Sequence, residues 1–61
     1  MADYEAYMMF EVVGFVRNAA DAETALCLAQ EENEAVTHVK EIPGAAGSRA
    51  IKRRRFEIEA E

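Results

Sequence analysis

The first third of the chain has the hydrophobic pattern of a β-strand. The run from Glu5 to Arg17 is rich in aromatic and β-branched residues, which favour extended structure. Successive side chains of a strand point to opposite faces, and here both faces would be apolar. One face would carry Met8, Phe10, Val12 and Val16, and the other would carry Tyr7, Met9, Val13 and Phe15.

The next stretch has the spacing of an α-helix. Residues 22–34 are mainly strong helix formers, and Asn18 and Asp21 precede them as candidate N-caps. Small apolar residues recur there at helical spacing, so the helix could lie close against a sheet, with Cys27 as a small core residue at the edge of this stripe. The stripe consists of Ala22, Ala25, Leu26 and Ala29.

Two further strands are predicted. Residues 35–42 alternate roughly and stop at Pro43 and Gly44, and residues 43–48 form a loop. Residues 49–60 then form a last strand with three apolar anchors. The prediction is a small two-layer α+β domain, a three-stranded sheet with one helix on one face in the order β-α-β-β. The first two strands would be parallel and the last two an antiparallel hairpin. The anchors are Ile51, Phe56 and Ile58.

Length and composition set limits on the chemistry. Sixty-one residues make one domain with a thin core. One cysteine and one histidine allow neither an internal disulfide nor a Cys/His zinc site, so no metal or cofactor is expected. Nothing in the spacing brings Cys27 to His38, and we expect no enzyme activity. No apolar run approaches the roughly 20 residues of a membrane span, so we expect a cytoplasmic protein that does not contact a membrane.

Charge is unevenly distributed along the chain. The net charge is −5, yet residues 49–55 hold five cations and no acid. These side chains could follow a nucleic-acid backbone by contacting its phosphates, or they could form surface ion pairs with the chain's own carboxylates. His38 could stack on a base, respond to pH, or be an ordinary strand residue. The basic residues are Arg49, Lys52, Arg53, Arg54 and Arg55.

One helix can cover only one face of the predicted N-terminal strand. The second apolar face is therefore either partly exposed or a surface for a protein partner or a second copy. Its residues are Tyr7, Met9, Val13 and Phe15.

The C-terminal part resembles a known family. Gly47-Ser48-Arg49, then Lys52-Arg53, then alternating Phe56 and Ile58 are similar to the C-terminal signature of the archaeal large-subunit ribosomal protein LX family. The resemblance implies ribosomal RNA as partner, with Arg49, Lys52 and Arg53 as contacts. It also implies the order β-β-α-β, with a helix across residues 31–46 instead of 22–34.

Two functions are therefore expected. The first is a ribosomal or ribosome-associated RNA-binding protein that uses the basic C-terminal strand. The second is a small acidic protein-interaction module, such as a regulatory or phage-type inhibitor or a minor subunit. In that case the chain would oligomerise or dock through its N-terminal strand.

Overall fold

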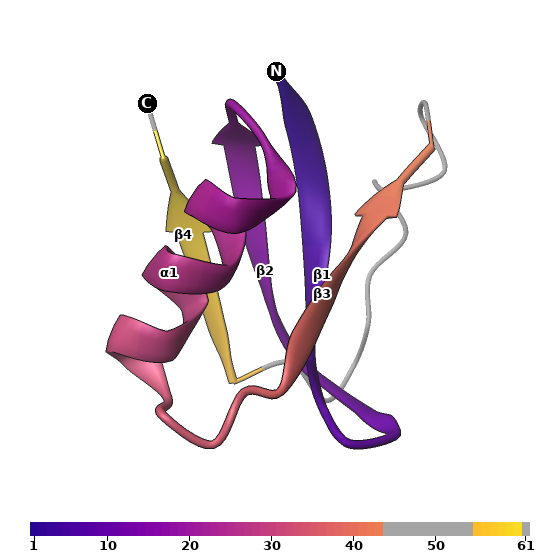
Figure 1. Cartoon of the computed structure of the whole chain (residues 1–61), viewed down its shortest axis with the longest axis vertical. Helices are drawn as coiled ribbons and strands as arrows, with labels where there is room; N and C mark the ends of the chain where they lie inside the picture. Colours follow the sequence, from indigo (N-terminus) through magenta and orange to yellow (C-terminus); the bar gives the residue numbers. More distant parts are fainter. Residues whose placement is uncertain (44–54, 61) are drawn as a thin grey trace.

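The computed structural model describes residues 1–43 and 55–60 of the chain. These residues form a mixed sheet of four strands with one helix across one face (Figure 1). The small α+β architecture is as predicted, but the sheet has four described strands rather than three. The elements are β1 (Ala2–Met8), β2 (Glu11–Ala19), α1 (Ala22–Glu32), β3 (His38–Ile42) and β4 (Phe56–Glu59).

β1 and β2 form an antiparallel hairpin where the sequence predicted one continuous strand. Met8 pairs with Glu11, so Met9 and Phe10 alone make the turn. Met9 has φ of 59°, a backbone region that disfavours any residue with a Cβ. Two-residue hairpin turns favour Gly, Asn and Asp, and none of these is present here. The prediction of a single strand is wrong because this turn uses atypical residues.

The strained turn leads to a stability prediction. Replacing Met9 with glycine should raise the free energy of unfolding by about 1 kcal/mol, because glycine adopts positive φ without a steric penalty. Urea unfolding followed by circular dichroism would measure the change. Met9→Ala is the matched control, since it shortens the exposed side chain but keeps the Cβ. An equal gain from alanine would show that the backbone of the turn is not the cause.

The sheet has the strand order β3-β1-β2-β4. β3 runs antiparallel to β1, and β4 runs parallel to β2. β3 and β4 are therefore on opposite edges of the described sheet and do not pair. The predicted hairpin between the last two strands is wrong, and so is the parallel pairing of the first two. Strand partners depend on packing between distant segments, which local patterns do not report.

The helix is close to its predicted position. α1 spans Ala22–Glu32, not 31–46, and the Asp21 side chain caps it by accepting a hydrogen bond from the Thr24 N–H at 2.8 Å. Ala25 and Ala29 are fully buried against the sheet. Cys27 is exposed, which corrects its prediction as a core residue. It lies two positions after Ala25, about 200° around the helix axis, and so on the outer surface.

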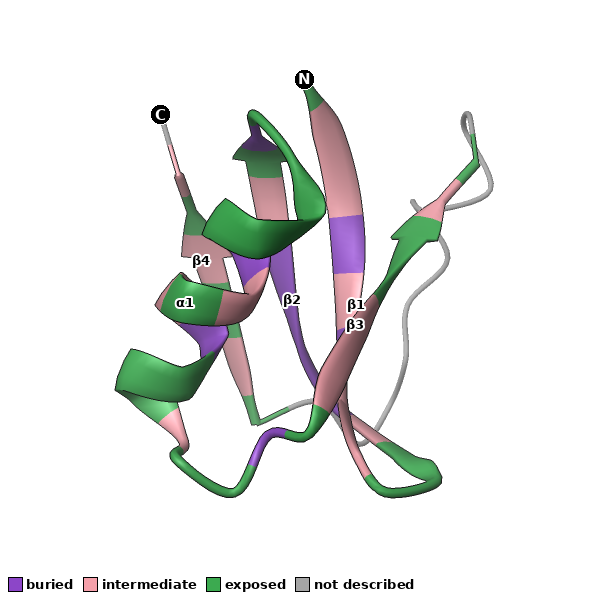
Figure 2. Ribbon diagram, in the orientation of Figure 1, coloured by how far each residue is buried: buried purple, intermediate pink, exposed green. Residues whose placement is uncertain are grey.

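The core lies between α1 and the sheet. Figure 2 shows the buried side of the helix turned toward the strands and its exposed side turned outward. Apart from Tyr4, small and medium apolar residues fill this layer, so the helix packs closely on the sheet. The cluster consists of Tyr4, Ala6, Val13, Val16, Ala19, Ala25, Ala29 and Val36.

Candidate functional site

The face of the sheet opposite α1, called the far face below, carries the Tyr7 and His38 rings and most of the charged side chains of the described sheet. Tyr4 pairs with Val16, and both belong to the helix-side core, so their sequence neighbours point the other way. The registers with β3 and β4 extend this assignment across the sheet. The far face contains Asp3, Glu5, Tyr7, Phe15, Arg17, His38, Lys40, Ile42, Glu57 and Glu59.

Arg17 ties three strands of the far face together. Its guanidinium donates to the carboxylates of Glu57 on β4 and Asp3 on β1, the latter at 3.2 Å. The same group lies 5.3 Å from the centroid of the fully buried Phe15 ring. The hydrogen bond to Glu57 is the main cause that raises the pKa of Arg17. Arg17 is therefore part of the structural framework.

Tyr7 and His38 form an aromatic stack on the far face. They are directly opposite each other on β1 and β3, with ring centroids 4.9 Å apart and an interplanar angle of 7°. Lys40 lies two residues further along β3, and its Nζ is 5.3 Å from the Tyr7 ring centroid. Both rings are half-buried and Lys40 is exposed. A planar stack beside a cation can bind a flat, negatively charged ligand.

Both tyrosines should ionise above the ordinary pKa of 10.0. Burial raises the pKa of Tyr7, as does its hydrogen bond to Glu5 at 3.1 Å. Burial also raises the pKa of Tyr4, followed by the charges of Glu41 and Asp21. A tyrosine whose pKa is higher in the folded than in the unfolded state favours the folded state as long as its side chain is neutral. This contribution to stability is complete at pH values below the pKa of the unfolded state. It is lost as the pH rises through the pKa of the folded state.

An ultraviolet absorbance titration should therefore show tyrosinate forming at higher pH in the folded protein than in urea. Stability should fall as pH rises above about 10. Glu5→Gln tests the assignment because it removes the negative charge beside Tyr7. It should lower the pKa of Tyr7 and leave that of Tyr4 unchanged. Coincident titration curves for folded and unfolded protein would contradict the prediction.

The four residues predicted as a partner surface do not share one face. Tyr7 and Phe15 lie on the far face, Val13 belongs to the helix-side core, and Met9 is in the hairpin turn. Val13 and Phe15 are fully buried, so neither side chain is accessible to a partner. The turn at Met9 and Phe10 breaks the alternation on which the prediction depended.

The hairpin tip is an exposed apolar feature that the sequence pattern did not single out. Phe10 is 93% exposed and Met9 is 65% exposed. The pattern assigned these residues to opposite faces of a strand, whereas the structure places them together at the end of the sheet. This tip could have been identified from the sequence only by predicting a tight turn between Met8 and Glu11.

Of the five basic residues predicted to contact RNA, only Arg55 is described. Arg49, Lys52, Arg53 and Arg54 lie outside the described residues. Arg55 is exposed, and its backbone N–H donates to the Val13 carbonyl at 2.6 Å. This bond fixes the start of β4 at the hairpin end of the sheet, where β1 and β3 also carry the aromatic stack.

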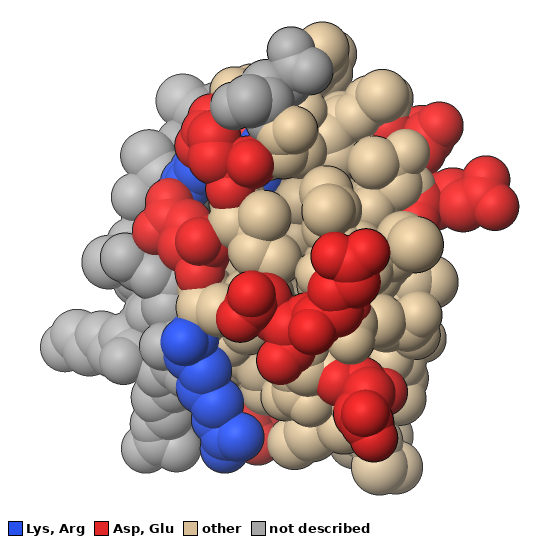
Figure 3. Space-filling view, turned by 90° about the vertical axis from the view of Figure 1, so that its left-hand side faces the viewer, with Lys and Arg blue, Asp and Glu red and all other residues tan. Residues whose placement is uncertain are grey.

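The described surface is strongly acidic. The described residues include eleven Asp and Glu but only three Lys and Arg, which are Arg17, Lys40 and Arg55. Figure 3 shows carboxylates spread over the side of the molecule formed by α1 and β4. By contrast, residues 44–54 contain four cations and no acid. The sequence segregates positive charge into one short segment.

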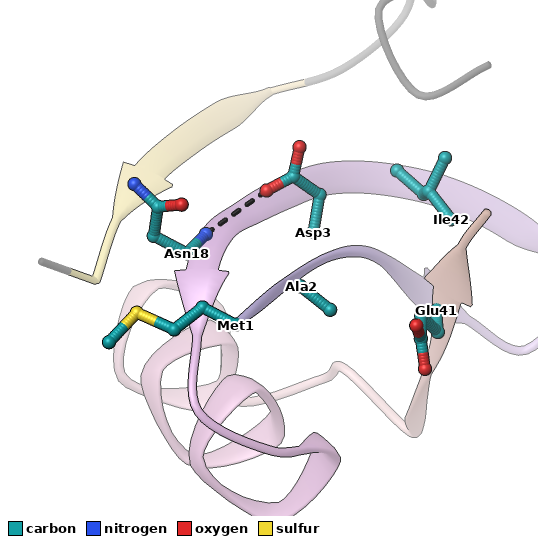
Figure 4. A pocket seen from close by; sticks show the side chains of 6 residues that line it. All are labelled: Met1, Ala2, Asp3, Asn18, Glu41 and Ile42. Atoms are coloured by element: carbon teal, nitrogen blue, oxygen red, sulfur yellow. Dashed lines mark hydrogen bonds between the residues drawn. The ribbon is translucent and has the colours of Figure 1, made fainter. Parts of the chain in front are cut away.

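A hollow of about 330 Å³ lies where β1 begins and β2 and β3 end, which is the end of the sheet away from the hairpin turn. Figure 4 shows the side chains that line it. Asp3 lines it, but its Oδ1 accepts from the Asn18 N–H at 3.1 Å and its Oδ2 accepts from Arg17. The carboxylate is therefore already occupied by the protein, and we assign no ligand to this hollow. The remaining lining residues are Met1, Ala2, Asn18, Glu41 and Ile42.

Comparison with protein-family models, curated proteins and solved structures finds no match for this chain. Among residues 1–43 and 55–60, no helix has the length and apolarity to span a membrane. In the same ranges, no group of three or more His, Cys, Asp or Glu residues is arranged to hold a metal ion.

Proposed function

We propose that this chain is a small, non-enzymatic RNA-binding protein of the ribosomal or ribosome-associated kind. The observation that carries the proposal is the position of Arg55, where the basic segment joins the sheet. The backbone bond to Val13 holds Arg55, the last cation of that segment, at the same end of the sheet as the Tyr7–His38 stack. A cation for phosphate, Arg55, and a base-stacking surface thus lie at one end of the described sheet, which suits a single-stranded RNA.

Charge also supports the proposal. A uniformly acidic protein would be repelled by phosphate, but here the cations are concentrated in Arg49–Arg55. Within the described residues, Lys40 and Arg55 form no ion pair, whereas Arg17 is bound by two carboxylates. The ribosomal part of the proposal comes from the resemblance of the C-terminal segment to the LX family, which implies ribosomal RNA as the ligand. The position of α1 at Ala22–Glu32 differs from the helix across residues 31–46 that the same resemblance implies.

Salt-dependent binding tests the proposal. Fluorescence anisotropy with a labelled short oligoadenylate should give an affinity that falls linearly on a plot of log affinity against log salt. The expected slope is about −0.7 per phosphate contact for a single strand. Reversing two charges, Arg53→Glu with Arg55→Glu, should weaken binding and flatten this slope. No binding at low salt would end the proposal.

A control variant distinguishes phosphate binding by the basic segment from attraction of RNA by the overall charge of the protein. Glu31→Lys with Glu34→Lys changes the net charge by the same amount in the opposite direction. Both residues are exposed, at the end of α1 and just after it. If the basic segment binds the phosphates, the RNA affinity of this variant should change little. A gain as large as the loss caused by the arginine variant would indicate non-specific attraction instead.

The exposed hairpin tip favours a second candidate function. Phe10 and Met9 present apolar surface next to polar neighbours, a combination found at protein interfaces. The chain would then be an acidic interaction module that docks or self-associates through the tip. Sedimentation over a concentration series tests self-association, and Phe10→Ser should abolish it. A strictly monomeric wild type at high concentration would exclude that version.

A further inference from the structure

The Tyr7–His38 stack is organised by the sheet itself. The two residues are cross-strand partners, and their centroid separation of 4.9 Å is close to the spacing of neighbouring strands. Each ring therefore stands on its own strand, and the stack extends sideways across the far face. Since β3 is an edge strand of the described sheet, one side of the His38 ring faces Tyr7, and no described strand lies beyond the other side, called the outward side below.

Hydrogen bonds hold this arrangement before any ligand arrives. His38 Nδ1 and Thr37 Oγ1 are hydrogen-bonded at 2.9 Å. Thr37 Oγ1 also accepts from the Met9 N–H of the hairpin turn at 3.1 Å. On the other ring, the Tyr7 hydroxyl donates to Glu5. The rings are thus preorganised, which reduces the entropy lost when a ligand binds.

The carboxylates of the far face are engaged within the protein. Glu5 accepts from Tyr7, and Arg17 binds Asp3 and Glu57. Glu59 accepts from the Asn18 side chain at 2.6 Å. Lys40 stands directly opposite Glu5 in the register, but it forms no ion pair with any carboxylate of the described residues. Its ammonium group therefore remains available beside the stack.

We propose that the outward side of His38 is a stacking site for one base of a single-stranded RNA, and that Lys40 contacts the adjoining phosphate. The base would add a third layer to the Tyr7–His38 stack. Stacking on aromatic rings is tolerant of base identity because every base has a flat π-face, so the site would bind without strong sequence preference. This inference rests on the proposed function, because it assigns a residue-level contact to the same RNA.

Two probes test the inference. One is a short oligoadenylate, and the other is an abasic oligomer with the same sugar–phosphate backbone but no bases. The wild-type protein should bind the oligoadenylate at least about fivefold more tightly, because a stacked base contributes on the order of 1–3 kcal/mol. His38→Ala should remove this preference while leaving the affinity for the abasic oligomer largely unchanged. Lys40→Gln should weaken both probes and reduce the slope by about 0.7.

His38→Phe is the matched rescue variant. It keeps a planar ring while removing the imidazole nitrogens, so it should retain the preference for the oligoadenylate. Urea unfolding of each variant would show whether the fold is intact. Equal affinity of the wild type for both probes would overturn the inference while leaving phosphate binding in place. Failure to bind either probe at low salt would overturn the proposed function itself.

Discussion

Replacing Gly14 with alanine is expected to destabilise the domain by about 1–3 kcal/mol, the usual cost of overpacking a filled interior. A Cβ built on Gly14 would lie 2.5 Å from three carbons of the Phe56 ring. Gly14 and Phe56 are partners in the parallel pairing of β2 with β4. The ring thus covers the glycine backbone, and any side chain at position 14 must displace it. Valine should cost more than alanine.

A double-mutant cycle with Phe56→Ala identifies the cause. Without the ring there is room at position 14, so Gly14→Ala should become neutral or slightly stabilising, because alanine loses less backbone entropy than glycine on folding. Urea unfolding of the four proteins in the cycle measures the coupling. If Gly14→Ala costs the same with and without the ring, the close approach of Phe56 does not explain the glycine.

Phe15→Ala should have the largest effect of a single truncation, about 3–5 kcal/mol. Among the described residues, the Phe15 side chain is the largest that is fully buried, and it lies on the far face beneath Arg17. A domain of this length has a total stability of about 3–9 kcal/mol. The variant should therefore be largely unfolded, or close to it, by circular dichroism at room temperature.

Phe15→Leu is the control, because it keeps most of the apolar volume and should cost clearly less than alanine. The comparison also tests the prediction of Phe15 as a partner-binding residue. A binding role on an exposed surface would leave Phe15→Ala stable in isolation and defective only in association. A fully stable Phe15→Ala protein would contradict the buried position of the ring.

Local patterns in the sequence were sufficient for some elements. The helix was predictable because Asp21 supplies a cap and Ala25 and Ala29 supply a narrow apolar stripe. Of the three predicted apolar anchors, Phe56 and Ile58 fall in β4, and Ile51 lies outside the described residues. The strand signal of residues 35–42 corresponds to β3, although β3 begins later, at His38. In each case residues close in sequence define the element.

Other features depend on contacts between distant residues. The hairpin was missed because positive φ at Met9 has no signature in a Met-Phe pair. The position of β4 beside β2 depends on how the Phe56 ring fits over Gly14, which no local pattern encodes. The sequence suggested that His38 could stack on a base. The register of β3 with β1 is what brings Tyr7 beside it.

The parallel pairing of β4 with β2 also has a consequence for solubility. β4 contributes only four residues, yet it occupies the outer edge of β2 along Gly14 to Arg17. If a protease removed this short strand, the backbone donors and acceptors of an apolar, β-prone segment would be unpaired. Uncovered edges of this kind recruit other chains and start aggregation. By covering this edge of β2, β4 would thus protect the molecule against aggregation through it.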